Sequence, residues 1–217
     1  MNTVSESITI MPLERKDGTF ALRLCLSQGE LSIAMLRRVM DVMTAYGLPT
    51  LRATTGQRMN LEGVPKDKLD EIVAALGTAV EKCPPGVSVC PGSAECRYGK
   101  QETRKLGRKL TSLVKENGPY PFKVKTGVSG CSFGCGLSFV RDIGLVGKSA
   151  GWDLYFGGSA TFSPGPGVAL GKKLSEDEVL DRVRKALAFY KENGRKRERI
   201  GSMVRRLGHE AVAESLK

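Results

Sequence analysis

Two cysteine-containing loops constrain this chain more than any other feature of its sequence. The first loop is Cys90-Pro-Gly-Ser-Ala-Glu-Cys96, and the second is Cys131-Ser-Phe-Gly-Cys135. Four thiolates from two loops match the ligand set of a [4Fe–4S] cluster. Glycines at positions 130, 134 and 136 let the backbone wrap closely and point N–H groups at sulfide and thiolate. The spacing therefore predicts that these four cysteines are the metal ligands of an iron–sulfur cluster.

Three alternatives apply to the same cysteines. A structural zinc site usually uses C-x2-C pairs, and neither pair has that spacing. A radical-type cluster would need a third cysteine close after the C-x3-C pair, but Ser138 occupies that position. Buried thiols without a ligand rarely occur as two spaced pairs in Gly-rich loops. Zinc and unligated thiols stay open as the weaker hypotheses.

The other two cysteines, Cys25 and Cys83, are expected to be thiols. No apolar run reaches the roughly 18 residues that suggest a membrane span, and the N-terminus lacks the pattern of a secretory signal. We therefore expect a cytoplasmic protein, in which cysteines are metal ligands or buried thiols more often than disulfides. Cys25 lies in a predicted strand, which favours the core. Core packing is also favoured for Cys83, although it lies close enough to the first loop to approach a cofactor.

The formal net charge of +11 has two broad explanations. Lys and Arg can neutralise nucleic-acid phosphates, or they can line a cavity for a small anion or a polycarboxylate cofactor. Much of the excess lies in Lys191–Arg206, which is predicted to be a solvated helical surface. Aromatic residues make up only 6% of the chain, too few for an obvious base-stacking platform. Nucleic-acid binding is therefore the less favoured explanation.

The first part of the chain predicts a compact α+β unit. Residues 7–12 and 19–27 alternate apolar and polar around a turn, as in a hairpin. Residues 30–46 have a helical period closed by Gly47, residues 51–61 have strand character broken near Gly56, and residues 66–76 are helical again. This ββαββα order indicates one domain over residues 1–77.

The second part, residues 78–217, differs from the first in composition and in sequence pattern. We expect an ordered loop over 82–99, a basic helix over 101–116, a strand over 122–128 and a second loop over 129–138. Strands are predicted over 139–146 and 152–156, followed by a flexible Gly/Pro-rich loop over 157–171. Ser175 then caps a helix, with Glu178 at the capping-box position, and helices continue to the C-terminus. The fold class is α+β throughout.

The combined pattern resembles the siroheme-dependent sulfite and nitrite reductases. The C-x5-C and C-x3-C pairs are similar to that family's cluster motif. LRATTGQRMNLEGV at 51–64 resembles its strand–turn–strand against siroheme, and PFKVKTGVSGCSFGC at 121–135 resembles its lysine-pair strand. YFGG at 155–158 resembles a loop that approaches the macrocycle. The resemblance implies a ferredoxin-like unit followed by a unit that binds a [4Fe–4S] cluster and siroheme.

The resemblance also implies roles for individual residues. Cys135 would be the ligand shared between a cluster iron and the siroheme iron. The siroheme would be lined by Thr54, Thr55, Gln57, Arg58, Gly157 and Gly158. The substrate anion would be held by Lys123 and Lys125, with Arg58 as the first arginine candidate, Arg52 as the second and Arg97 as a weaker one. His209 is expected to have no catalytic role.

The implied reaction is the six-electron reduction of sulfite to sulfide, with nitrite as an alternative substrate. Electrons would come from an external donor such as a ferredoxin, because no flavin or nicotinamide motif is visible. The chain carries one copy of each unit, as in the small single-copy sulfite reductases. It departs from many relatives at GGSATFSPGPG, which has no basic residue. An electron-transfer subunit without catalytic haem is the alternative from another class of protein.

Overall fold

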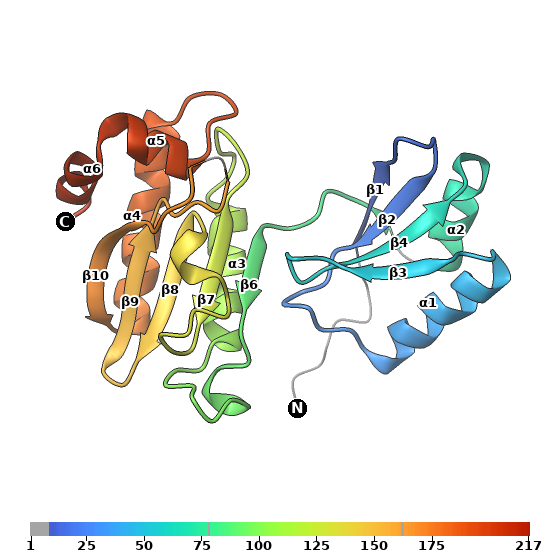
Figure 1. The fold of residues 1–217 in the computed structure, drawn as a ribbon, viewed down its shortest axis with the longest axis horizontal. Coiled ribbons are helices and arrows are strands. Elements are labelled where there is room, and N and C mark those ends of the chain that lie inside the picture. The colour runs from blue at the N-terminus through green and yellow to red at the C-terminus, as the bar shows by residue number, and fades with distance from the viewer. Residues whose placement is uncertain (1–8, 78, 162) are drawn as a thin grey trace. The chain divides into compact units, whose positions relative to one another are not determined.

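The computed structural model describes residues 9–77, 79–161 and 163–217, and it divides into two compact units between Pro84 and Pro85 (Figure 1). The first unit begins with β1 (Thr9–Glu14) and β2 (Phe20–Leu24), an antiparallel hairpin in which Ile10 pairs with Leu24. Residue 7, where the hairpin was predicted to start, lies outside the described residues. α1 (Ile33–Ala45) follows, and it begins later than predicted because the Ser32 side chain accepts a hydrogen bond from the Met35 amide.

The rest of the first unit completes a five-stranded sheet. β3 (Thr50–Ala53) and β4 (Met59–Val64) form the strand–turn–strand predicted over 51–61, and the break does fall beside Gly56. The short helix η1 (Lys66–Lys68) leads into α2 (Leu69–Ala75), and β5 (Ala79–Val80) pairs parallel to β1. The strand order is β3-β4-β2-β1-β5. The core includes Ile10, Leu22, Val39, Leu61 and Ile72.

The second unit contains another five-stranded sheet, with the order β10-β9-β8-β7-β6. Its strands are β6 (Gly86–Val89), β7 (Lys125–Ser129), β8 (Ile143–Lys148), β9 (Gly151–Phe156) and β10 (Val168–Leu174). β6, β7 and β8 are parallel, whereas β9 and β10 are antiparallel to their neighbours. The parallel strands matter for function because their carboxyl ends share one edge of the sheet.

Helices pack against one face of the second sheet (Figure 1). They are α3 (Arg104–Glu116), α4 (Glu176–Asn193), α5 (Ile200–Leu207) and α6 (His209–Ser215), with short turns η2 (Gly92–Ala94) and η3 (Ser138–Val140) in the loops. The predicted capping box of Ser175 and Glu178 is present at the start of α4. The shared core includes Leu110, Val128, Ile143, Leu187 and Tyr190. Across the described ranges, no helix is both long enough and apolar enough to cross a membrane.

Two strands of the second unit were not predicted, and neither was β5 of the first unit. β6 lies inside the segment 82–99 that was expected to be a loop, and β10 begins inside the predicted flexible loop 157–171. β6 has only four residues, and the register of β10 shifts at Gly171, so neither strand shows a clean alternation. The strand expected from Phe139 begins only at Ile143, because residues 138–140 form η3.

Cys25 and Cys83 form a disulfide, with their Cα atoms 5.4 Å apart. The prediction of two free thiols was therefore wrong. Cys25 directly follows β2, and the Cys25 amide donates to the Thr9 carbonyl. The Glu81 amide donates to the Ile10 carbonyl and so brings the segment that contains Cys83 to the same part of the sheet. The partners are 58 residues apart, and only their positions in the fold reveal the pair.

Candidate cluster and anion site

The two cysteine loops start at the same edge of the second sheet. β6 and β7 are parallel, and Val89 pairs with Val128. Cys90 and Cys131 therefore follow neighbouring strands at their carboxyl ends. The Cys90 amide donates to the Val128 carbonyl at 3.1 Å, and the Gly130 amide donates to Cys90 Sγ at 3.1 Å. An N–H group thus already points at one of the predicted cluster thiolates.

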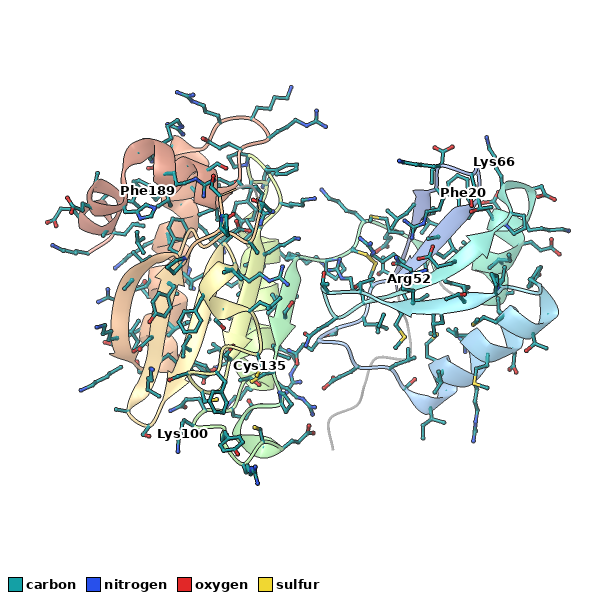
Figure 2. The ribbon with its side chains drawn as sticks, viewed as in Figure 1. Phe20, Arg52, Lys66, Lys100, Cys135 and Phe189 are labelled. Carbon is teal, nitrogen blue, oxygen red and sulfur yellow. A yellow bond between two sulfur atoms is a disulfide. The ribbon has the colours of Figure 1, made fainter. Side chains whose placement is uncertain are left out.

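Cys96 and Cys135 are positioned by tight turns further along the same loops. The Cys96 amide donates to the Gly92 carbonyl at 2.9 Å. Gly134 has a φ of +70°, which places the chain in a left-handed turn just before Cys135. The two loops are tied together by the Lys100 amide, which donates to the Gly130 carbonyl at 2.7 Å. Figure 2 shows Cys135 and Lys100 at the same end of the second unit.

The donor set fits an iron–sulfur cluster. All four cysteines are free thiols, and Cys135 is exposed whereas the other three are half-buried. Among the residues that the structure describes, no three His, Cys, Asp or Glu side chains stand close enough to hold a single metal ion. A tetrahedral zinc site needs its donors around one ion, whereas the thiolates of a cubane cluster each bind a different iron and stand further apart around the cluster. Free thiols from two loops at one sheet edge match the second requirement.

Lys125 lies on the opposite face of β7 from the helices, whereas Lys123 precedes the strand, with its ammonium group 5.2 Å from the centre of the Phe122 ring. Val124 and Val128 are buried in the core on the helical side, so the alternation of the strand directs Lys125 and Gly127 to the other side. A Cβ placed on Gly127 would lie 3.0 Å from Arg141 Cγ. The Arg141 side chain therefore crosses β7 on the face that Lys125 shares.

A buried carboxylate organises this face. Asp142 is only 1% exposed, and it accepts two hydrogen bonds from Arg199, at 3.2 Å from Nε and 2.5 Å from Nη2. It also accepts from the Lys125 amide at 2.8 Å, while its own carbonyl accepts from the Gly157 amide at 2.7 Å. Burial raises the pKa of Asp142, and the hydrogen bonds from Arg199 oppose that shift. Asp142 thus joins β7, the end of β9 and the start of α5.

The cations around Lys125 outnumber this one carboxylate. Burial lowers the pKa of Lys125 below its ordinary value, and neighbouring positive charges lower it further; these belong to Arg141, Arg199 and Lys123. Sequence reasoning identified both lysines but missed Arg141, Asp142 and Arg199. One signal was available, because Asp142 interrupts an otherwise apolar run in FVRDIGLVG, and a buried carboxylate requires a partner.

Gly157 and Gly158 are required by packing within the second unit. Gly157 has a φ of +84°, and a Cβ there would lie 2.5 Å from the Val204 side chain of α5. A Cβ on Gly158 would lie 2.7 Å from the Arg141 carbonyl oxygen. The YFGG loop therefore lies against the segment that carries Arg141 and Asp142. Contact of these glycines with siroheme stays a prediction.

The remaining predicted residues of the siroheme site belong to the first unit. Thr54 closes the β3–β4 turn: its amide donates to the Arg58 carbonyl, and its hydroxyl accepts from the Arg58 amide. Thr55 and Gln57 lie within this turn, and Gln57 has a φ of +55°. Arg58 Nη2 donates to the Pro84 carbonyl at 2.6 Å, and burial lowers the pKa of Arg58.

The other two arginine candidates also have partners in the chain, and the histidine lies elsewhere in the second unit. Arg52 is exposed on β3 (Figure 2) and pairs with Glu62 at 3.4 Å. The Arg97 guanidinium lies 4.7 Å from the centre of the Tyr98 ring and donates to its hydroxyl. His209 begins α6. Arg97 is therefore engaged with its own neighbour, and the case for it as an anion ligand is weaker than for Lys125.

Comparison with known proteins bears on both units. The family model described as "Nitrite/Sulfite reductase ferredoxin-like half domain" matches residues 13–79, and that described as "Nitrite and sulphite reductase 4Fe-4S domain" matches residues 81–217. The chain resembles a solved structure titled "Structure of Mycobacterium tuberculosis NirA protein", with a TM-score of 0.79 at 20% identity over 96% of this chain and 41% of that chain. At that identity the likeness concerns the fold alone.

Two curated relatives extend the match in sequence. The chain is 36% identical to an assimilatory-type sulfite reductase of Nitratidesulfovibrio vulgaris, over 94% of this chain and 95% of the relative. It is 34% identical to a nitrite reductase [NAD(P)H] of Bacillus subtilis, over 89% of this chain but only 24% of the relative. The predicted resemblance is confirmed: the chain belongs to the nitrite and sulfite reductase family of oxidoreductases, whose cofactors are a [4Fe–4S] cluster and siroheme.

Proposed function

We propose that the protein catalyses the six-electron reduction of sulfite to sulfide. The observation that carries this proposal is the group of cations on one face of β7, in the same unit as four free cysteines. An electron carrier needs the cysteines but has no use for an anion pocket. The preference for sulfite is supported by the Nitratidesulfovibrio vulgaris relative, which the chain matches over nearly its whole length and which is named a sulfite reductase.

In this proposal each group of residues has a separate task. Cys90, Cys96, Cys131 and Cys135 would hold the cluster, and Cys135 would also serve as the protein's thiolate toward siroheme. Siroheme, when bound, would supply the iron at which the anion is reduced with electrons from the cluster. Its carboxylates require cationic and N–H partners when they are buried. Those partners would come from the 54–58 turn and from the YFGG loop.

The lysines hold the anion and supply protons. Lys123 and Lys125 present ammonium groups to a substrate whose oxygen atoms leave as water, which needs both positive charge and proton donors. A lowered pKa makes Lys125 a better proton donor than an ordinary lysine. Arg58 and Arg52 are the proposed arginine ligands from the first unit. Asp142 and Arg199 act through Lys125, because they fix the backbone that carries it.

Nitrite reduction is the second candidate, and it rests on a specific observation. The Bacillus subtilis relative is named a nitrite reductase and is nearly as similar over the shared region. Nitrite and sulfite are both small oxyanions that suit a cationic pocket. The two functions are separated by kcat/KM for each anion with a reduced viologen dye as donor. A higher kcat/KM for sulfite supports the proposal, and a higher value for nitrite overturns the substrate assignment.

The proposed partners follow from the reaction. Electrons are supplied by an external one-electron carrier such as a ferredoxin, and the proposed location is the cytoplasm. Nucleic acid is not a proposed partner. The basic charge is instead assigned to the anion and to the siroheme carboxylates.

A further inference from the structure

An exposed pair of aromatic rings lies on the two cysteine loops. Phe133 stands between Cys131 and Cys135 and is 70% exposed, whereas Tyr98 follows Cys96 and is 47% exposed. The ring centres are 5.3 Å apart in an edge-to-face arrangement. Exposed apolar side chains that contact one another are typical of interaction sites, whereas single ones are common on any surface. We call Tyr98 and Phe133 the aromatic pair.

The surroundings of the aromatic pair are basic. Arg97 stacks on Tyr98, Lys148 donates to Ser132 beside Phe133, and Lys100 is exposed on the same loop as Tyr98. The nearest acidic side chains on the first loop are engaged. Glu95 pairs with Arg104 at 2.9 Å, and Glu102 accepts the amides at the start of α3. Lys148 also lies 3.9 Å from an Asp153 carboxylate oxygen, so the positive charge left around the pair belongs mainly to Arg97 and Lys100.

The position of this surface limits what can use it. Both rings are separated from predicted cluster ligands by no more than two residues. Electrons for the proposed reaction have to reach the cluster from outside the chain. A protein that delivers them needs a close approach to the cluster, an apolar contact to order it and opposite charge to guide it.

We propose that the aromatic pair and its basic rim form the docking surface for an acidic one-electron carrier protein. This inference rests on the proposed function, because it names the partner that supplies the reductase. Two rings with a charged rim form a small contact, which suits a transient redox complex. Carboxylates on the carrier would face Lys100 and Lys148, and an apolar spot would cover Phe133.

The test measures activity with two electron donors and, separately, the binding of one of them. The holoenzyme and its Phe133→Ser, Tyr98→Ser and Lys100→Glu variants are assayed with reduced methyl viologen and with a photoreduced acidic bacterial ferredoxin. Binding of the oxidised ferredoxin is measured by calorimetry at low salt. Ile33→Ser, an equally exposed apolar side chain on α1, and Lys66→Glu, an exposed lysine on η1, are the matched controls. Iron per chain is measured in every variant.

We expect each of the three variants to lower kcat/KM with ferredoxin by about tenfold, as for a residue at the centre of an interface. Their viologen rates should stay within about twofold, and the Lys100→Glu defect should shrink as salt screens the charge. Binding should weaken by the same factor as kcat/KM, and both controls should behave like the wild type. If Phe133→Ser loses iron, Tyr98→Ser and Lys100→Glu carry the test.

Three results would overturn the inference. One is unchanged ferredoxin binding in all three variants. Another is an equal loss of rate with both donors at full iron content, which would place these residues in catalysis. The third is a dimer in solution that Phe133→Ser dissociates, which would assign the pair to a second copy of the chain. Failure of the proposed function looks different, because the wild type would then bind ferredoxin yet reduce neither anion with viologen.

Discussion

At the scale of single residues, the anion site depends on how Lys125 is held. Its amide is fixed by a buried carboxylate, and its ammonium group shares a face of β7 with the Arg141 side chain. Burial and the nearby cations lower the pKa of Lys125. The site therefore holds one lysine that loses its proton more readily than a surface lysine.

The lowered pKa predicts a specific pH dependence. The protonated form of Lys125 binds the anion, so kcat/KM should fall as the pH rises through the pKa of Lys125 in the free enzyme. Because that pKa is lowered, the fall should come below the range of an ordinary lysine. Lys125→Arg keeps its charge there and should move the alkaline limb upward, while Lys185→Arg on α4 serves as the control. An alkaline limb that stays in place in Lys125→Arg would contradict this role.

The ion pair between Asp142 and Arg199 makes a separate prediction about stability. Asp142→Asn leaves a partly buried guanidinium without its charge partner, which should cost about 3 kcal/mol in the free energy of unfolding of the second unit. The only tryptophan, Trp152, is 4% exposed in β9 and reports that unfolding in urea. The control is Asp181→Asn, which removes an exposed pair with Lys185 and should leave the free energy of unfolding almost unchanged. Equal losses in the two variants would show that Asp142 has no special structural role.

The residue scale also shows what local sequence can predict. The four cysteines could be assigned because the signal lies in the spacing within each loop and in the glycines around it. Arg199 is 57 residues from Asp142, and no local pattern connects them. The disulfide between Cys25 and Cys83 was missed for the same reason, since its partners meet only when β5 pairs with β1.

At the scale of elements, the edge formed by β6 and β7 organises the second unit. Parallel pairing brings the residues after both strands together, and this places Cys90 beside the Gly130 amide. The α3 and α4 helices and the β7–β9 strands could largely be predicted because they are long or clearly amphipathic. β6 could not be predicted, because a strand of four residues that begins with glycine is too short to show the alternation of apolar and polar residues.

The disulfide ties the end of the first unit to its sheet. Because it closes a loop of 58 residues, replacing both cysteines by alanine should lower the free energy of unfolding of this unit by about 2–4 kcal/mol. Hydrogen exchange over residues 9–76 measures the loss, and unfolding of the second unit, followed by Trp152, should be unchanged. Exchange in the first unit that is the same with and without the disulfide would contradict this expectation.

At the scale of the whole molecule, a small chain with a net charge of +11 is explained by a cofactor that carries many carboxylates and by an anionic substrate. The exposed aromatic pair belongs to the cluster loops. A single proposed function, that of a reductase, explains the family membership, the free cysteines and the cations around Lys125.

The most direct test of this account is an absorption spectrum of the anaerobically purified protein, with iron and acid-labile sulfide measured on the same sample. The account predicts siroheme bands and one more iron than sulfide per chain, because siroheme contributes one iron in addition to those of the cluster. A cluster spectrum without siroheme bands, even when siroheme is supplied during expression, would indicate an electron-transfer protein. Zinc in place of iron would contradict the account at its first step.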